Sequence, residues 1–211
     1  MGTYDQADWD VRLDWGEDGV ESLAPVSDVT VIVDVLSFST SVDVATSRGA
    51  VVFPFPWRDA RLDAFAASVD ADVADGRHPR GWSLKPSTLL DVECGARLVL
   101  PSPNGSHLTT LAAVHGPVLA GCLRNATAVG RRARQLGATV AVIAYGERWR
   151  GSGRLRPALE DLVGVGAIVR ALGGSASPEA RAAAMVFDAA RDDLLAMLLQ
   201  CASGREKVED G

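Results

Sequence analysis

Short apolar runs of strand length alternate along this chain with polar loops and helical stretches. The clearest run is VTVIVDVL at 29–36, which ends in a polar patch and leads into a helical stretch that closes at Gly49. The same plan recurs in apolar runs at 51–56, 97–100, 118–121 and 139–145. Strands that alternate with helices favour parallel pairing, because a parallel connection needs a crossover that a helix can supply. We therefore predict an α/β fold, a mostly parallel sheet with helices on both faces, in a single domain over 1–211.

Proline and glycine mark further boundaries. Ser177 followed by Pro178 is typical of a helix start, and Pro157 could begin another helix that runs to 172. Between 72 and 90 the periodic pattern breaks into Gly, Pro, His, Arg and Ser. A long irregular segment inside a compact domain is often functional, so we expect a loop of the active site here.

Composition excludes several classes of protein. With 47% apolar residues among 211, the chain can bury a sizeable core. The net charge is -6 and basic residues form no run with interleaved aromatics, so we expect no nucleic-acid partner. The apolar runs are too short to cross a membrane and the N-terminus is acidic, so we expect no membrane partner and a cytoplasmic location.

Two further expectations concern cysteines and self-association. Cys94, Cys122 and Cys201 are scattered and odd in number, which argues against a disulfide framework. The alanine-rich, apolar stretch at 179–199 could bury a partner face, which makes a homo-oligomer possible, although such stretches more often pack within their own chain.

The loops that directly follow the predicted strands are the natural place for a site, because ligands bind outside the carboxyl ends of parallel strands. The loops at 34–41, 102–106, 122–125 and 146–156 are rich in hydroxyls, amides, glycine or arginine. Backbone N–H groups at helix starts and arginine forks suit an oxyanion, which predicts a phosphate site. Ordinary helix caps and turns use the same residue types and remain the alternative for any one loop.

Asp34 is the most informative single residue, because it is a carboxylate near the end of an otherwise apolar strand. Its burial without a partner would cost several kcal/mol, so a divalent cation or a neighbouring arginine would compensate it, and a structural aspartate that caps a neighbouring loop is the alternative. Glu160 and Asp161, near a helix start, could point at the same cleft or could simply stabilise the helix N-terminus. Magnesium prefers oxygen ligands and keeps several waters, so one or two carboxylates with a substrate phosphate would suffice.

Four segments, in this order and spacing, resemble the 2-phosphosulfolactate phosphatase family. They are VIVDVLSFSTSVDVATSRGA, LVLPSPNGSHLTTLAA, LAGCLRNATAV and the stretch from AYGERW to LRPALEDLVGVGAIV, and the resemblance spans about 30–205. It implies Mg²⁺-dependent hydrolysis of a small acidic phosphomonoester, in the best-known case 2-phosphosulfolactate on a route to coenzyme M.

The resemblance also implies roles for individual residues. Asp34, Glu147 and Glu160 are the expected catalytic residues, with Glu147 as a general base or as support for the metal ligands. The expected metal ligands are Asp34, Glu160 and Asp161. The residues expected to hold anionic oxygens of the substrate are Ser37, Lys85, Asn104, Gly105, Arg124 and Asn125.

The chain departs from the family pattern at two places that bear on the substrate. Many members carry arginine where this chain has Ser37, and a Gly-Asn-Ser-Pro stretch where it has WSLKPS at 82–87. Ser37 removes a cation and Lys85 can restore one, so the substrate can differ from 2-phosphosulfolactate.

Two other functions stay open at this point. One is a non-catalytic binding protein for a small phosphorylated or sulfonated acid, which would bind its ligand without magnesium. The other is a Mg²⁺-dependent lyase or isomerase with Glu147 as its base, which would form product without releasing phosphate.

Overall fold

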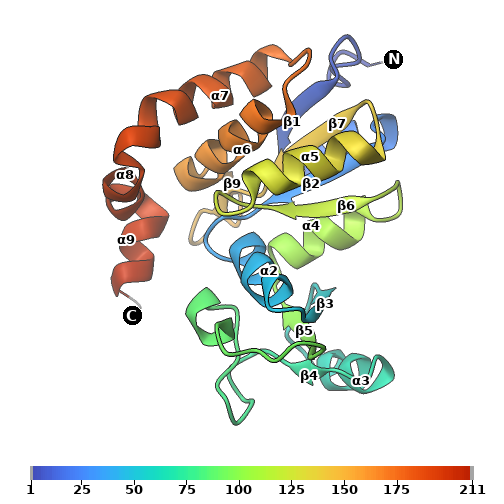
Figure 1. The fold of residues 1–211 in the computed structure, drawn as a ribbon, viewed down its shortest axis with the longest axis vertical. Helices are drawn as coiled ribbons and strands as arrows, with labels where there is room; N and C mark the ends of the chain where they lie inside the picture. Colours follow the sequence, from blue (N-terminus) through green and yellow to red (C-terminus); the bar gives the residue numbers. More distant parts are fainter. Residues whose placement is uncertain (1, 210–211) are drawn as a thin grey trace.

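The computed structural model describes residues 2–209 and contains two parallel sheets and one antiparallel hairpin (Figure 1). The first sheet has the order β1 (Val11–Trp15), β7 (Val140–Ala144), β2 (Val29–Val33) and β6 (Val118–Gly121). The second has the order β3 (Val51–Phe55), β5 (Arg97–Pro101) and β4 (Asp72–Val73). The hairpin pairs β8 (Glu147–Arg148) with β9 (Leu155–Arg156). The predicted α/β class with mostly parallel strands is confirmed, but the strands divide between two sheets.

Helices cover both faces of the first sheet. One face packs against α5 (Ala126–Leu136), α6 (Leu159–Leu172) and α7 (Pro178–Ala190), and the other against α1 (Gly16–Leu23), the 3-10 turn η1 (Ala24–Val26) and α4 (Gly105–Ala112). Within β2, Val31 and Val33 face the first group of helices and Ile32 faces the second. Because successive side chains of a strand point to opposite faces, burial on both faces explains the unbroken apolar run that predicted this strand.

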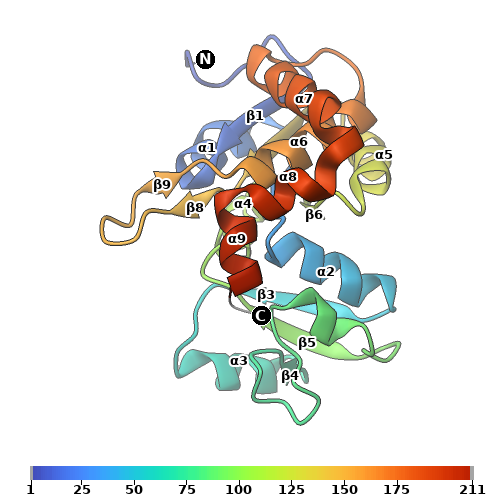
Figure 2. The same cartoon turned by 90° about the vertical axis from the view of Figure 1, so that its left-hand side faces the viewer.

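The second sheet lies between α2 (Phe38–Ser47) and α3 (Arg61–Ser68). The irregular segment expected at 72–90 begins with β4 and ends in the 3-10 turn η2 (Pro86–Leu89), and its Trp82 and Leu89 pack with α2. Each of two helices follows a strand of one sheet and packs against the other sheet. Helix α2 follows β2 of the first sheet and packs on the second, and α4 follows β5 of the second sheet and packs on the first (Figure 2). The starts of α2 and α4 therefore meet at the junction between the sheets.

The C-terminal helices run alongside this junction (Figures 1 and 2). They are α8 (Leu194–Gln200), which follows the 3-10 turn η3 (Arg191–Asp193), and α9 (Ala202–Glu209). No residue of α8 is buried, although its sequence is LLAMLLQ, and the exposed fractions of Leu195 and Leu199 are 71% and 50%. The homo-oligomer expected from 179–199 remains a prediction.

Several smaller expectations can be compared directly. Ser177 caps α7 by accepting a hydrogen bond from the Ala180 N–H at 3.2 Å, as predicted, whereas α6 begins at Leu159, two positions after Pro157. The three cysteines are free, as expected. Over residues 2–209, the helices include none that is both long and apolar enough to cross a membrane.

The close approach of α6 and α7 depends on Gly166. A Cβ atom at this position would overlap the Ala183 carbonyl oxygen and would lie 2.7 Å from the Phe187 Cβ. We expect Gly166→Ala to lower the free energy of unfolding by about 1–3 kcal/mol, the usual cost of overpacking, despite the better helix propensity of alanine. Urea unfolding measures this, with Gly116→Ala as the control, because a Cβ at Gly116 meets only the Asp28 carbonyl oxygen at 3.5 Å. Equal stability of both variants and the wild type would contradict this packing.

Candidate active site

Asp34 follows β2 directly and is buried at the junction between the two sheets. Its Oδ1 accepts a hydrogen bond from the Phe38 N–H at 3.2 Å, and its Oδ2 accepts one from the Gly105 N–H at 3.1 Å. Phe38 begins α2 and Gly105 begins α4. One carboxylate thus satisfies free donors at two helix starts, where a negative charge is favoured.

Gly105 allows these helix starts to approach each other. A Cβ atom at this position would overlap the ring and the Cβ of Phe38. Its N–H, which we expected to hold a substrate oxygen, donates to Asp34 instead. Gly105 therefore lies beside Asp34, and in this structure its N–H is occupied by that carboxylate.

Asp161 makes an equivalent bridge behind the cavity. Its Oδ1 accepts a hydrogen bond from the Val35 N–H at 2.7 Å, and its Oδ2 accepts one from the Gly146 N–H at 2.8 Å. The buried side chain therefore joins the loop after β2 to the loop after β7. Burial, followed by the nearby charge of Asp34, raises the pKa of Asp161 well above its ordinary value. Asp161 is absent from the cavity lining, so its expected role as a metal ligand stays a prediction.

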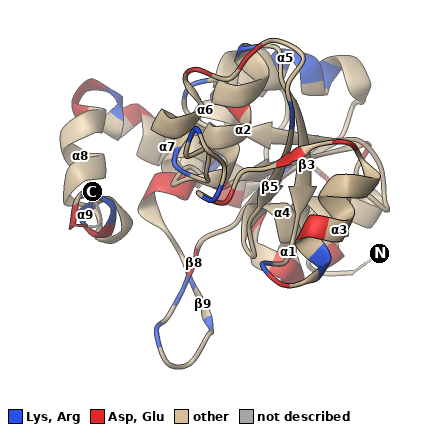
Figure 3. Ribbon diagram, turned by 90° about the horizontal axis from the view of Figure 1, so that it is seen from below, with Lys and Arg blue, Asp and Glu red and all other residues tan. Residues whose placement is uncertain are grey.

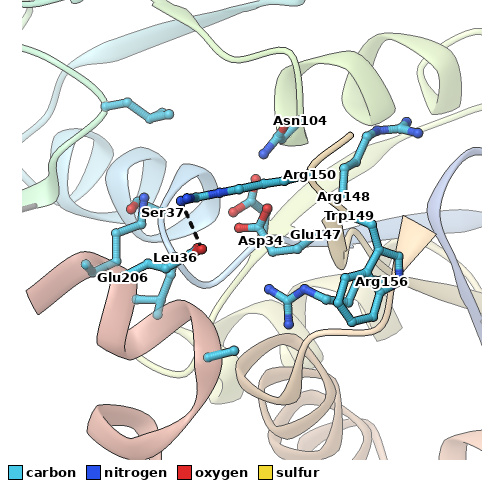
Figure 4. A pocket seen from close by; sticks show the side chains of 13 residues that line it. Asp34, Leu36, Ser37, Asn104, Glu147, Arg148, Trp149, Arg150, Arg156 and Glu206 are labelled. Atoms are coloured by element: carbon cyan, nitrogen blue, oxygen red, sulfur yellow. Dashed lines mark hydrogen bonds and ion pairs between the residues drawn. The ribbon is translucent and has the colours of Figure 1, made fainter. Parts of the chain in front are cut away.

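A cavity of about 580 Å³ opens above Asp34, between the β8–β9 hairpin and α9. Figure 4 shows the carboxylates of Asp34 and Glu147 beside each other, with the Arg150 side chain extending past them to Glu206 and the Arg156 side chain nearby. Of the residues predicted from sequence, the cavity brings together Asp34, Ser37, Asn104 and Glu147. The remaining lining residues are Leu36, Leu84, Arg148, Trp149, Arg150, Arg156, Ala202, Glu206 and Lys207.

The two carboxylates of the cavity both have raised pKa values. Burial raises the pKa of Asp34 to about 7, with a smaller increase from the charge of Glu147, against the opposing effect of the Phe38 and Gly105 N–H groups and of Lys207. The pKa of Glu147 is raised by burial and then by the charge of Glu160, while Lys207 and Arg156 lower it. A bound cation would relieve the cost of both negative charges.

The oxygen donors of the cavity fit a magnesium ion whose coordination is completed by water and by the substrate phosphate. Within residues 2–209, no group of three or more His, Cys, Asp or Glu side chains forms a ready-made metal cluster. Mg²⁺ commonly takes only one or two carboxylates and completes its shell with waters and substrate phosphate. The Asp34 carboxylate has room for about four hydrogen-bond or ligand contacts and uses two of them on backbone N–H groups. Lone pairs therefore remain for a cation.

Glu160 and Arg124 lie outside the cavity lining. Glu160 is buried, and its Oε2 accepts a hydrogen bond from the Cys201 Sγ at 3.5 Å, which places it behind the cavity wall. Arg124 forms an ion pair with Asp43 at 3.0 Å. Their expected roles in catalysis and substrate binding stay predictions, and in this structure both side chains contact the protein instead.

Asn125 and Lys85 are also absent from the lining. Asn125 accepts a hydrogen bond from the Cys122 N–H at 2.8 Å and donates one to the Ala120 carbonyl at 3.0 Å, so it shapes its own loop. The segment around Lys85 contributes Leu84 to the lining, and the Ser41 hydroxyl holds the Leu84 carbonyl at 2.7 Å.

The cations of the cavity are the residues that sequence reasoning did not single out. Arg148, Arg150 and Arg156 come from the β8–β9 hairpin, which projects from the body with its basic residues along it (Figure 3). The sequence predicted that the loop at 146–156 belongs to the site, but it did not indicate which of the arginines of this loop line the cavity. Lys207, from α9, lies far in sequence from every strand-end loop, so reasoning from those loops did not find it.

Comparisons with known proteins give similarities that span most of this chain. The family model described as 2-phosphosulpholactate phosphatase matches residues 18–207. A protein of Gloeobacter violaceus named "Probable 2-phosphosulfolactate phosphatase" is 32% identical over 196 residues, which cover 87% of this chain and 80% of the relative. Both matches include the loops that line the cavity.

The raised pKa of Asp34 makes stability depend on pH. The unfolded chain releases this proton near pH 3.8 and the folded protein near pH 7, so between these values the folded state binds more protons. Stability should therefore fall as pH rises through this window, by on the order of 4 kcal/mol from this group. Asp34→Asn should remove that part of the decrease.

Urea unfolding in EDTA from pH 4 to pH 8 measures the effect. Asp192→Asn, at a side chain that is 95% exposed, is the control and should follow the wild type. Identical slopes for the wild type and Asp34→Asn would show that Asp34 ionises as freely in the folded protein as in the unfolded chain.

Proposed function

Because the chain belongs to the 2-phosphosulfolactate phosphatase family and is a phosphoric monoester hydrolase, we propose that it hydrolyses a small acidic phosphomonoester with Mg²⁺ held at Asp34. The observation that carries this proposal is the cavity whose lining combines two carboxylates of raised pKa with four basic side chains. Acidic groups suit a cation and an attacking water, and basic groups suit a phosphate.

Mg²⁺ at this place would neutralise charge on the phosphoryl oxygens as hydrolysis proceeds. Asp34 is positioned for this task, because the starts of α2 and α4 fix its orientation from both sides. Asn104 belongs to the same wall, and its Oδ1 accepts a hydrogen bond from the Tyr145 hydroxyl at 2.8 Å. That contact leaves the Asn104 amide N–H₂ group as a donor to a substrate oxygen.

Glu147 is the candidate for the general base. Its carboxylate is half-buried, lies beside Asp34 and has a raised pKa, so one of its oxygens can accept a proton from the attacking water. Arg148 and Arg156 stand on the hairpin at the same side of the cavity. The side chain of Arg148 is oriented by Glu17 at 2.5 Å and by the Gly153 carbonyl at 3.0 Å, so it presents a fixed charge. Such donors hold phosphoryl oxygens in position, from which phosphoryl transfer gains most of its rate.

We propose 2-phosphosulfolactate or a related 2-phospho-acid as the substrate. Ser37 lines the cavity at the place where many family members carry arginine, so this enzyme relies on its hairpin arginines and on α9 for positive charge. Because the positive charge comes from different positions, the substrate can be a 2-phospho-acid other than 2-phosphosulfolactate. The cytoplasmic location and the place on a route to coenzyme M remain predictions.

Phosphate release from a panel of phosphomonoesters that includes 2-phosphosulfolactate and 2-phospholactate tests the reaction. We expect turnover with Mg²⁺ and none with EDTA, and Asp34→Asn should lower kcat by about 100-fold or more, the usual cost of removing a group that stabilises transition-state charge. Asp63→Asn on α3, an exposed carboxylate paired with Arg77, should retain activity.

The other outcomes of this assay separate the alternatives. Anion binding that EDTA does not affect, without release of phosphate from any ester, would replace the enzyme with a binding protein. Conversion of a phosphorylated acid without phosphate release would instead support a lyase or isomerase.

Two arginines allow the site seen in the structure to be compared with the substrate-binding role predicted from sequence. Arg156 lines the cavity and Arg124 pairs with Asp43 outside it. We expect Arg156→Gln to lower kcat/KM by about 10- to 100-fold, the factor for losing one charged hydrogen bond, and Arg124→Gln to have an effect of less than about fivefold. Steady-state kinetics on the best ester of the panel decide this, and a larger loss in Arg124→Gln would restore the sequence-based role of Arg124.

A further inference from the structure

The last helix of the chain delivers a basic side chain to the cavity. Ala202, Glu206 and Lys207 of α9 all line it, together with residues that follow β2 and β7. Ser203 and Lys207 are four positions apart, so they lie on one side of the helix. The cavity is therefore assembled from both halves of the chain.

Three polar contacts fasten α9 to the elements around the site. At its start, the Cys201 Sγ donates to the Glu160 Oε2 at 3.5 Å. One turn on, the Arg156 Nη2 donates to the Ser203 Oγ at 3.2 Å, and near the end the Arg150 Nη2 pairs with the Glu206 Oε1 at 3.1 Å. The two arginines are hairpin residues that line the cavity, so the same hairpin positions α9 and contributes charge to the site.

Apolar packing contributes little to the placement of α9. Only Ser203 and Gly204 of this helix are buried, and Val208 is 63% exposed. The preceding helix, α8, buries no residue at all. What α9 contributes to the cavity is charge and hydrogen bonding.

Lys207 decides the balance of charge in the cavity. Among the described residues that line it, the basic side chains are Arg148, Arg150, Arg156 and Lys207, and the acidic ones are Asp34, Glu147 and Glu206. Arg148 is paired with Glu17 and Arg150 with Glu206. Without Lys207 the acidic and basic groups of the lining would be equal in number, so the side chains alone would give an anionic substrate no net electrostatic attraction.

We propose that Lys207 is a substrate-binding residue that contacts the second acidic group of the phosphomonoester, the carboxylate or sulfonate that is not transferred. This inference rests on the proposed function and adds a role for the C-terminal helix. An ammonium group is a compact charge with three donors, which suits a carboxylate or sulfonate oxygen without demanding the planar geometry of a guanidinium. Ser203 and Glu206 are positioning residues, because they act by holding α9 against the hairpin.

The test compares Lys207→Met, Lys207→Arg and Arg205→Met. Arg205 is an exposed residue of the same helix that does not line the cavity, so Arg205→Met removes the same charge from the same helix. On the best ester of the panel with Mg²⁺, Lys207→Met should raise KM by about 10- to 100-fold with little change in kcat, the factor expected for one charged hydrogen bond to bound substrate. Lys207→Arg should recover most of the loss, and Arg205→Met should match the wild type.

Two results would overturn the proposal. One is a KM for Lys207→Met equal to that of the wild type. The other is an equal rise in KM for Arg205→Met, which would assign the effect to the general charge or stability of α9. Thermal unfolding of each variant shows whether the fold is retained, and Lys207→Arg keeps the test informative if Lys207→Met unfolds.

A binding measurement separates this proposal from the proposed function. If the wild type hydrolyses no ester, the proposed function fails, and sulfolactate, which carries the carboxylate and sulfonate but no phosphate, then serves as the probe in calorimetric titrations. Weaker sulfolactate binding by Lys207→Met than by Arg205→Met would support Lys207 as the residue that binds the second acidic group, and equal binding by the two variants would reject it.

Discussion

The hydrogen bonds of the Asp34 carboxylate hold the molecule together where its two sheets meet. A carboxylate buried without partners would destabilise the fold by several kcal/mol. Here it accepts one N–H from α2 and one from α4, helices that follow strands of different sheets. Gly105 makes this possible, because any side chain there would overlap Phe38. The group that joins the sheets is also the group that faces the cavity, so the architecture and the chemistry share one side chain.

Backbone donors at helix starts are the usual means of binding phosphate in α/β folds. In this protein, Asp34 already accepts the N–H groups at the starts of α2 and α4, and Asp161 accepts N–H groups of the loops after β2 and β7. Positive charge for an anionic ligand therefore comes from side chains on the β8–β9 hairpin and on α9. In the proposed function, two peripheral elements therefore set affinity and specificity, while the two sheets fix the carboxylates.

The sequence alone predicted the parts of this arrangement that depend on local pattern. Apolar runs followed by polar loops predicted the main parallel strands. The position of Asp34 at the end of such a run singled out a carboxylate that lines the cavity. The division into two sheets could not be predicted, because it depends on which sheet each helix packs against after it leaves its strand. Arg124 is paired with Asp43, which is far away in sequence, and Lys207 reaches the cavity through the tertiary packing of α9. Neither contact can be predicted from the residues next to these side chains in the sequence.

The exposed helix α8 acts as a spacer between the body of the protein and α9. Its exposed side chains, those of Leu195, Leu199 and Gln200, can vary with little cost to the core. Its length cannot vary in the same way, because one added or deleted residue in an α-helix rotates everything beyond it by about 100°. Such a change would turn the cavity-lining side of α9 away from the hairpin while both sheets stayed folded. Among relatives of this protein, α8 should therefore tolerate substitutions far better than insertions or deletions.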